Sequence, residues 1–284
     1  MEAVYNWHVT ERCQYSCKYC FAKWGNTKEI WQNVKLTSAL LDQIRIHGRE
    51  PFGEGYKTAP IRLNFAGGEP LLLKQRLIDI AKESKSLGLK TSLITNGERL
   101  GQSLELVSKL DMIGLSIDSF DEATNRAIGR IRSSGKALSF QDVYDLVTKI
   151  RTINPEILLK FNVVVNKYNY RENLIPKLLS LSPQKIKVLQ ELSAGGNVSS
   201  TNDEMFSHFI SNNQCDCSNV YIEDRNSMIQ SYLMINPSGR FYQNGNQNDY
   251  FYSAPIHEVG LLRAMKSISF NQQQFSNRYN GAKK

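Results

Sequence analysis

Short apolar segments alternate with longer amphipathic segments along the first 190 residues of this chain. The short segments have the length and composition of buried β-strands, and they span residues 3–9, 61–65, 91–95, 112–117, 158–165 and 185–190. Helical patterns lie between them, at residues 36–47, 71–87, 100–110, 121–128, 140–150 and 170–179. Repeated strand–helix units form parallel sheets, and six are too few for a closed eight-stranded barrel. The sequence therefore predicts an α/β fold, a partial, open (β/α)6 barrel whose site lies at the carboxyl ends of the strands.

The regular alternation ends at about residue 190. A small polar loop, a helical segment and a β-hairpin follow, at residues 192–200, 201–211 and 231–243. The hairpin is indicated by Pro237-Ser238-Gly239, which supplies turn geometry between two apolar runs. We expect two parts: a barrel core over residues 1–190, and an α+β extension over residues 191–284 that covers the open side of the barrel.

Three cysteines follow the first predicted strand in one short loop. Cys13, Cys17 and Cys20 have the spacing C-x3-C-x2-C. Iron-sulfur cubanes normally take four thiolate ligands, so three thiolates leave one iron open to a ligand from outside the protein. An open metal position is typical of a reactive site. Two alternatives are a zinc site that takes a fourth ligand from Cys215 or Cys217, and disulfides among the five cysteines.

The cysteine spacing, with Phe21 directly after the last cysteine, resembles the signature of the radical S-adenosylmethionine (SAM) enzymes. The run Gly67-Gly68-Glu69-Pro70 ends the second predicted strand and resembles the motif with which these enzymes hold SAM. Alone, such a run is an ordinary tight turn, since paired glycines permit unusual backbone geometry. Together the two motifs imply a barrel of the radical SAM type with a 4Fe–4S cluster on three cysteines and SAM on the open iron.

Polar side chains also stand at the ends of later predicted strands. Thr95, Ser116 and Asn162 lie at or near the ends of the third, fourth and fifth strands, and Arg130 follows the fourth. Each has an ordinary explanation, because such residues cap helices or neutralise helix dipoles. The fold would nevertheless bring all of them to one rim.

Four cations fall inside predicted strands: Arg62, Lys160, Lys185 and Lys187. Lys185 and Lys187 share one face because side chains alternate along a strand. Inside a barrel, charged side chains are costly unless they meet an opposite charge, so an anionic ligand would explain them. If they point toward the outer helices or solvent, they are ordinary surface charges. The excess of 35 Lys and Arg over 27 Asp and Glu also suits an anionic ligand.

Longer runs resemble the viperin family. They include Asn6-Trp7-His8-Val9-Thr10, Ser116-Ile117-Asp118-Ser119-Phe120-Asp121-Glu122, Ile128-Gly129-Arg130, Lys185-Ile186-Lys187-Val188-Leu189-Gln190 and Ser231-Tyr232-Leu233. The resemblance implies an antiviral enzyme that converts a ribonucleoside triphosphate to its 3'-deoxy-3',4'-didehydro analogue, with CTP expected and UTP or GTP as alternatives. In that family a 5'-deoxyadenosyl radical takes hydrogen from C4' of the ribose, and the 3'-hydroxyl leaves as water.

The same resemblance implies the roles of individual residues. Cys13, Cys17 and Cys20 would bind the cluster. The SAM pocket would comprise Phe21, Gly67, Gly68, Glu69, Thr95, Ser116, Arg130, Asn162 and Val164. The nucleotide would contact Asn6, Arg62, Lys160, Lys185, Lys187 and Tyr232, and we hypothesise that Arg278 in the basic tail closes over it. An electron donor such as a flavodoxin or ferredoxin would be the partner.

Other sequence features limit where this protein acts and which partners it has. The first residues lack a signal-peptide pattern and no segment has the roughly 20 apolar residues of a membrane span, so we expect a cytoplasmic protein without a membrane partner. No block of like charges suggests a nucleic-acid-binding arm. The remaining alternatives are a radical SAM activity on RNA or a peptide, and a non-enzymatic zinc-binding module. Peptide-modifying relatives usually carry many additional cysteines, whereas only Cys215 and Cys217 remain here.

Overall fold

The computed structural model describes residues 1–22, 25, 28–193, 199–244 and 250–280. These residues form one ten-stranded sheet in the order β10-β9-β8-β1-β2-β3-β4-β5-β6-β7. Its strands are β1 (Ala3–Thr10), β2 (Ile61–Gly67), β3 (Lys90–Thr95), β4 (Met112–Ser116), β5 (Leu158–Val165), β6 (Lys185–Gln190), β7 (Val220–Glu223), β8 (Leu233–Ile235), β9 (Arg240–Asn244) and β10 (Tyr250–Pro255).

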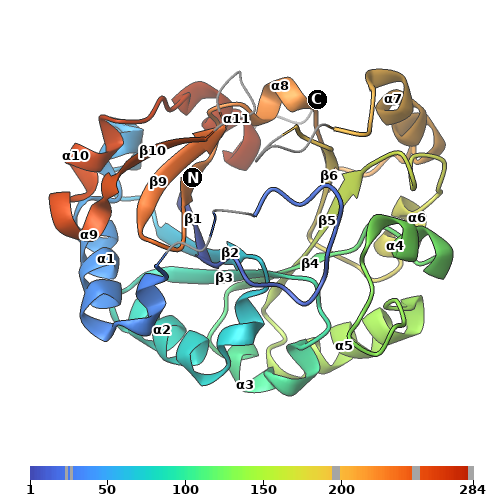
Figure 1. The fold of residues 1–284 in the computed structure, drawn as a ribbon, viewed down its shortest axis with the longest axis horizontal. Helices are drawn as coiled ribbons and strands as arrows, with labels where there is room; N and C mark the ends of the chain where they lie inside the picture. The colour runs from blue at the N-terminus through green and yellow to red at the C-terminus, as the bar shows by residue number, and fades with distance from the viewer. Residues whose placement is uncertain (23–24, 26–27, 194–198, 245–249, 281–284) are drawn as a thin grey trace.

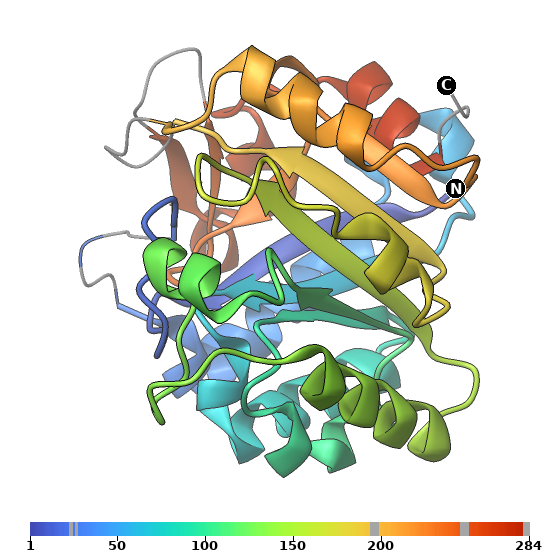
Figure 2. The ribbon, with the colours of Figure 1, turned by 90° about the vertical axis from the view of Figure 1, so that its right-hand side faces the viewer.

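The six predicted strands are the centre of this sheet. Strands β1 to β6 pair in sequence order and all in parallel, and β7 adds a further parallel strand beside β6. Figure 2 shows β1 running from the amino terminus to the cysteine-containing loop at the other end of the strands. The prediction of an open, mostly parallel α/β barrel is confirmed by this order.

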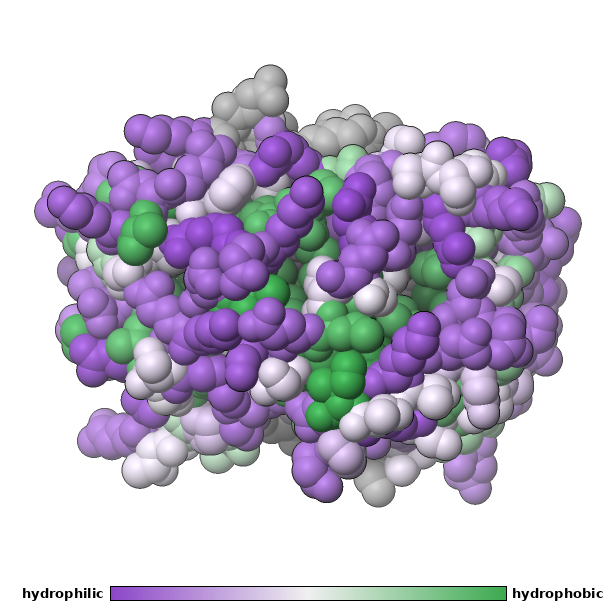
Figure 3. Space-filling model, turned by 90° about the horizontal axis from the view of Figure 1, so that it is seen from below, coloured by the Kyte–Doolittle hydropathy of each residue, from purple (hydrophilic) through white to green (hydrophobic). Residues whose placement is uncertain are grey.

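Helices cover the outer face of the sheet (Figures 1 and 2). The α-helices are α1 (Val34–His47), α2 (Gln75–Ser86), α3 (Leu104–Val107), α4 (Glu122–Ile128), α5 (Phe140–Ile153), α6 (Ile175–Leu179), α7 (Asp203–Asn212), α8 (Arg225–Met228), α9 (Ile256–Val259), α10 (Leu261–Met265) and α11 (Gln272–Asn280). Short 3-10 helices span Ile30–Gln32, Glu50–Phe52, Glu54–Tyr56, Pro70–Leu73 and Leu100–Gln102. The helical outer face seen in Figure 3 is mostly hydrophilic, with small apolar areas between charged groups.

Three helices are shorter than their sequence patterns predict. The segment 71–87 is interrupted at Lys74, whose φ of +50° is outside the helical range, and 100–110 is reduced to a 3-10 turn and the short α3. The segment 170–179 becomes helical only at α6. Before it, the side chains of Asn166 and Asn169 bond to nearby backbone N–H groups and hold a turn instead of a helix.

The two faces of the sheet differ in chemistry. Apolar strand residues such as Trp7, Phe65 and Phe161 are fully buried against the helices. The opposite, inner face carries buried polar residues, among them Asn6, Asn64 and Lys187. Apolar side chains are the usual filling of a barrel, so this polar interior indicates a site.

The segment after residue 190 adds strands to both edges of the same sheet. Strand β7 joins β6, and β8 to β10 continue from β1, with β8 parallel to β1 and β9 and β10 antiparallel. Helix α11 links the two sides, because Tyr279 accepts a hydrogen bond from Asn6 of β1 (3.5 Å) and Arg278 donates one to Glu223 of β7 (2.8 Å). The sequence patterns indicated the β8–β9 hairpin but not β7 or β10.

None of the described helices combines the length and apolar character needed to cross a membrane.

We predict that Asn213→Ala destabilises the fold. The buried Asn213 side chain accepts from the N–H groups of Leu174 and Ile175 at the start of α6, both at 2.8 Å, and donates to the carbonyls of Glu172 and Phe209. Its loss leaves buried backbone groups unpaired, at a cost of about 2 to 4 kcal/mol. Urea unfolding measures the loss. The exposed neighbour Asn212→Ala is the control and should change stability by less than about 0.5 kcal/mol; equal effects of the two variants would contradict the prediction.

Candidate active site

Three free cysteines lie in the loop that follows β1, at the carboxyl ends of the strands. Hydrogen-bond donors point at two of the sulfurs. The Tyr15 N–H and the Asn96 amide approach Cys13 Sγ at 3.3 and 3.8 Å, and Arg130 approaches Cys17 Sγ at 3.9 Å. Burial raises the pKa of Cys13 to about 12 and that of Cys17 to about 11, so a cation is needed to keep these groups as thiolates.

These residues fit an iron-sulfur cluster. Donors aimed at cluster sulfurs stabilise a bound cluster, and each of the three thiolates would bind a different iron. Within the described ranges, no three His, Cys, Asp or Glu side chains are close enough to hold a single metal ion. Cys215 and Cys217 precede β7 and thus lie toward the amino ends of the strands, away from the cysteine loop. Neither of these two cysteines can therefore supply the fourth ligand that the zinc alternative requires.

The glycines of residues 67–70 allow the backbone to meet the cysteine loop. The N–H groups of Gly68 and Glu69 donate to the carbonyls of Thr10 and Arg12 at 2.7 and 2.8 Å. Gly67 has a φ of +135°, and a Cβ on Gly68 would come within 2.2 Å of the Arg12 carbonyl. Only glycine fits both positions, since a side chain would strain the first and collide at the second.

Glu69 is fully buried, and its carboxylate is bound by neighbouring protein groups. It accepts from the Leu71 N–H (3.1 Å), the Thr95 hydroxyl (2.7 Å) and the Asn96 N–H (2.9 Å). Burial raises the pKa of Glu69. The predicted SAM residues Glu69 and Thr95 thus bind each other through their side chains, which leaves the backbone of residues 67–69 as the part of this motif that can meet a ligand. Asn96 links this carboxylate to Cys13, a role that sequence reasoning missed.

Arg130 supports the other side of the cysteine loop. Besides Cys17, it contacts the Tyr19 hydroxyl at 3.0 Å, the Ser116 carbonyl, and Asp118 at 3.5 Å. Asp118 in turn accepts from the Val164 N–H at 2.9 Å. Asn162 pairs beside Ser116 in the β4–β5 register, so four predicted residues gather here. Sequence reasoning missed Tyr19 and Asp118, although Asp118 lies within the quoted run of residues 116–122.

Phe21, also predicted to line the SAM pocket, contacts a different set of residues. Its side chain is 38% exposed and its ring lies 5.6 Å from the ring of the buried His8. The His8 Nδ1 lies 3.0 Å from the Tyr242 hydroxyl, and burial lowers the pKa of His8 to about 3, so the imidazole is neutral. Phe21 thus joins the cysteine loop to the β8–β10 side of the barrel.

The four predicted strand cations line one cavity inside the barrel. The cavity has a volume of about 120 Å³ and is lined by Glu2, Asn6, Arg62, Asn64, Ile94, Met112, Lys160, Lys185, Lys187 and Tyr279. Arg62 donates to Ser92 (3.0 Å), Ser92 to Asn64 (2.7 Å), and Asn64 to Asn6 (2.9 Å). These side chains form a continuous hydrogen-bonded chain across the inner face.

All three lysines of the cavity lie where burial disfavours their charged form. Burial, followed by repulsion from Lys187, places the pKa of Lys160 well below its usual value. Burial lowers the pKa of Lys187 to about 7. Lys185 is partly buried, with its ammonium 4.0 Å from the centre of the Tyr221 ring, and burial lowers its pKa as well. An anion bound in the cavity would favour the charged form of all three.

Glu223 of β7 is a buried carboxylate next to this cavity that sequence reasoning missed. It forms an ion pair with Lys187 and accepts from the Tyr232 hydroxyl (2.7 Å) and Arg278 (2.8 Å). Although burial acts to raise it, the attraction of Lys187 and Arg278 lowers the pKa of Glu223 to about 2. The predicted residues Tyr232 and Arg278 therefore meet at Glu223, with the Arg278 guanidinium 3.8 Å from the Tyr232 ring centre. The apolar run Val220-Tyr221-Ile222 before Glu223 was the available signal for this strand.

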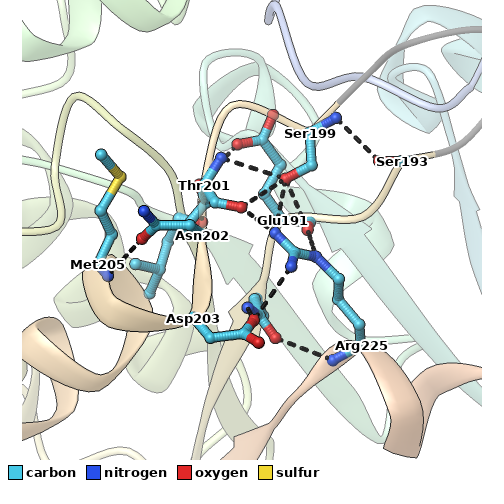
Figure 4. A network of polar contacts seen from close by, with 10 residues as sticks. Glu191, Ser193, Ser199, Thr201, Asn202, Asp203, Met205 and Arg225 are labelled. Atoms are coloured by element: carbon cyan, nitrogen blue, oxygen red, sulfur yellow. Dashed lines mark hydrogen bonds and ion pairs between the residues drawn. The ribbon is translucent and has the colours of Figure 1, made fainter.

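A polar network fixes the chain segment that follows β6 (Figure 4). Arg225 donates to the Glu191 carbonyl (3.1 Å), Asp203 (3.1 Å) and Ser199 (2.9 Å), and it also contacts the Thr201 carbonyl. The Glu191 carboxylate accepts from the Thr201 hydroxyl at 2.7 Å. The network holds both ends of the connection between β6 and α7 at the carboxyl rim of the barrel.

Comparison with known proteins agrees with this geometry. Residues 7–174 match the Radical SAM superfamily. The solved structure of native anSMEcpe with bound AdoMet superimposes with a TM-score of 0.63 at 14% identity, covering 97% of this chain and 82% of that one. The fold and the cysteine loop thus define a radical SAM enzyme, which uses a 4Fe–4S cluster and SAM.

Sequence relatives narrow the family. A protein from Fibrobacter sp. (strain UWH6) is 37% identical over 97% of this chain and 87% of its own length, and one from Pseudoalteromonas ulvae is 38% identical over 98% and 93%. Both are named S-adenosylmethionine-dependent nucleotide dehydratase. The chain belongs to this family of S-adenosylmethionine-dependent nucleotide dehydratases, and the expected resemblance to viperin is confirmed.

We predict that Gly68→Ala impairs cluster assembly. The new Cβ would lie 2.2 Å from the Arg12 carbonyl and 2.6 Å from the Glu11 carbonyl, so the cysteine loop must move. After anaerobic reconstitution, the variant should hold most of its fold by circular dichroism but bind much less iron and sulfide than the unsubstituted protein. Gly101→Ala is the control, because nothing lies within 4 Å of its Cβ position. Full iron content in Gly68→Ala would show that the close approach is not required.

Proposed function

We propose that this enzyme dehydrates a ribonucleoside triphosphate, CTP first and UTP or GTP as alternatives, to the 3'-deoxy-3',4'-didehydro nucleotide, and that the product acts as a chain terminator in antiviral (antiphage) defence. The names of the relatives support a nucleotide substrate. The observation that carries the proposal is the pairing, in one barrel interior, of a cation-lined cavity and a cysteine loop. A polyphosphate would occupy the first and SAM would bind beside the second.

The strand geometry gives the separation of the two sites. Arg62 stands near the start of β2 and Gly67 at its end. At about 3.3 Å per residue, the five intervening steps place the cation layer roughly 16 Å from the glycines that meet the cysteine loop. The ribose and base would occupy the space between, beside Asn6 and Asn64. A ligand anchored by its phosphates would therefore point its sugar toward SAM.

The chemistry then divides between cofactor and protein. When bound, the cluster and SAM supply the radical that removes hydrogen from C4' of the ribose, using an electron from an external donor such as a flavodoxin or ferredoxin. The protein holds the ribose in place and excludes water, which is the main contribution that a protein makes to cofactor chemistry. Contacts at the distant phosphates fix the position of the reacting carbon, so binding energy is used for orientation.

The shape of the cation site favours a small anionic ligand over RNA. The cations line a cavity of about 120 Å³ on the inner face of the sheet, within the barrel. RNA recognition uses an extended basic surface instead. The direct test is to incubate the reconstituted enzyme with SAM, a reductant and each nucleotide separately. Mass spectrometry should find 5'-deoxyadenosine and a nucleotide that has lost water, with CTP the best substrate; SAM cleavage without any such nucleotide would refute the proposal.

We predict that Lys160→Ala weakens CTP binding by about 1.5 to 3 kcal/mol, because a charge-assisted contact to phosphate is lost. That is roughly 10- to 150-fold in Kd, while cytidine binding should change little. Isothermal titration calorimetry with CTP and cytidine measures both. Lys149→Ala, an exposed cation on α5, is the matched control and should leave both ligands unaffected. Equal losses for CTP and cytidine would argue against a phosphate contact.

We also predict that triphosphate binding takes up protons at pH 8. Burial lowers the pKa of Lys187 to about 7 and that of Lys160 well below normal, and a bound anion raises both. Below pH 7, Lys187 is charged with or without ligand. Above pH 7, triphosphate binding must add a proton to Lys187. The affinity therefore falls as the pH rises, by up to about tenfold per pH unit for each proton taken up. Calorimetry in buffers of different ionisation enthalpy counts the protons. Lys160→Ala should take up fewer; zero uptake by the unsubstituted enzyme would contradict the assignment.

A further inference from the structure

The side-chain oxygen atoms around the cation-lined cavity already accept hydrogen bonds from other protein groups. Glu2 lines the cavity, and its two carboxylate oxygens accept from Lys90 and Arg62, both at 2.8 Å. The Asn6 side-chain oxygen accepts from Asn64 (2.9 Å), and the Asn64 oxygen accepts from Ser92 (2.7 Å). Each potential metal ligand on this wall thus has a hydrogen-bonding partner.

Both carboxylate oxygens of Glu223 also have protein partners. One carboxylate oxygen pairs with Lys187, and the other accepts from both the Tyr232 hydroxyl and Arg278. Recruiting this group to a metal ion would leave a buried ammonium and a buried guanidinium without their anion. That is unfavourable, because breaking a buried ion pair leaves uncompensated charge.

The cations suffice to neutralise a polyphosphate. Arg62, Lys160, Lys185 and Lys187 line the cavity, and Arg278 lies behind Glu223. Lys90 shares Glu2 with Arg62, so six cations face the carboxylates of Glu2 and Glu223 and leave an excess of four positive charges once the lysines are protonated. A metal-free triphosphate carries about four negative charges near neutral pH, of which a bound Mg²⁺ would cancel two. The metal-free form therefore matches the cavity better.

We propose that this cavity accepts the nucleotide triphosphate without Mg²⁺, and that its lysines and arginines perform the charge neutralisation that Mg²⁺ provides at other nucleotide sites. Mg²⁺ requires near-octahedral oxygen ligands and retains several waters. The described lining offers a small volume and a carboxylate, Glu2, that is already paired. The inference rests on the proposed function, since it specifies which form of the substrate binds.

The test uses the reconstituted full-length enzyme, with CTP as the probe in calorimetry. One titration contains EDTA and the other contains MgCl₂ in large excess over CTP, at equal ionic strength. We expect the apparent Kd to rise at least tenfold with Mg²⁺, in proportion to the fall in metal-free CTP. An apparent Kd that is unchanged or lower with Mg²⁺ would overturn the inference. CMP binds Mg²⁺ only weakly and is the matched ligand control, with its Kd expected to change by less than about twofold.

A second measurement follows the metal directly. Mn²⁺ is bound to CTP in solution, and electron paramagnetic resonance then reports the concentration of free Mn²⁺ as enzyme is added. If the enzyme takes CTP without metal, the signal of free Mn²⁺ increases; a decrease means that metal and nucleotide bind together and refutes the inference. Binding that requires a metal would leave the proposed function intact. Absence of CTP, UTP and GTP binding under both conditions would refute the proposed function and this inference together.

Discussion

Buried positive charge inside the barrel is the constraint that shapes the rest of this structure. Lysines on β5 and β6 point into a cavity inside the barrel, where burial disfavours their charged form. Glu2 and Glu223 lie against the cations from the two sides of the barrel and partly compensate them. The carboxyl-terminal helix adds Arg278 to the same group. Stability alone would favour apolar side chains in this space, so the buried cations are best explained as a binding site for an anion.

The opposite end of the barrel depends on close backbone packing. Gly67 and Gly68 let β2 run against residues 10–12, and two backbone hydrogen bonds lock the contact. Glu69 and Asn96 extend this support to Cys13, while Arg130 supports Cys17 from the other side. The cysteine loop is thus held by two neighbouring strand ends rather than by its own short sequence. Such support orients the sulfurs before a cluster arrives.

The central fold was predictable because each βα unit is short and its apolar pattern is local. The six central strands, the cysteine loop and the strand cations follow from periodicity and spacing in the chain. What could not be predicted depends on contacts between distant segments. Glu223 lies in a four-residue strand, and its role becomes clear only from its contacts with Lys187, Tyr232 and Arg278. Each of these partners comes from a different part of the chain. Likewise, Glu69 was expected to face SAM, but the alternative partners Thr95 and Asn96 become visible only when β2 and β3 are placed side by side.

The two ends of the barrel also differ in how much of each belongs to the part of the chain that matches the Radical SAM superfamily. The Radical SAM match ends at residue 174, so it contains the cysteine loop, the glycine motif, Arg130 and Lys160. Lys185, Lys187, Glu223, Tyr232 and Arg278 all lie beyond it, on β6, β7, α11 and the approach to β8. A solved structure with bound AdoMet shares the fold at only 14% identity, which is consistent with a common scaffold for the cofactor. Under the proposed function, Arg62 and Lys160 of the common core and the groups that the chain adds after it would bind the substrate together. Changes in the added groups could then direct one radical chemistry to different molecules without altering the residues that hold the cofactor.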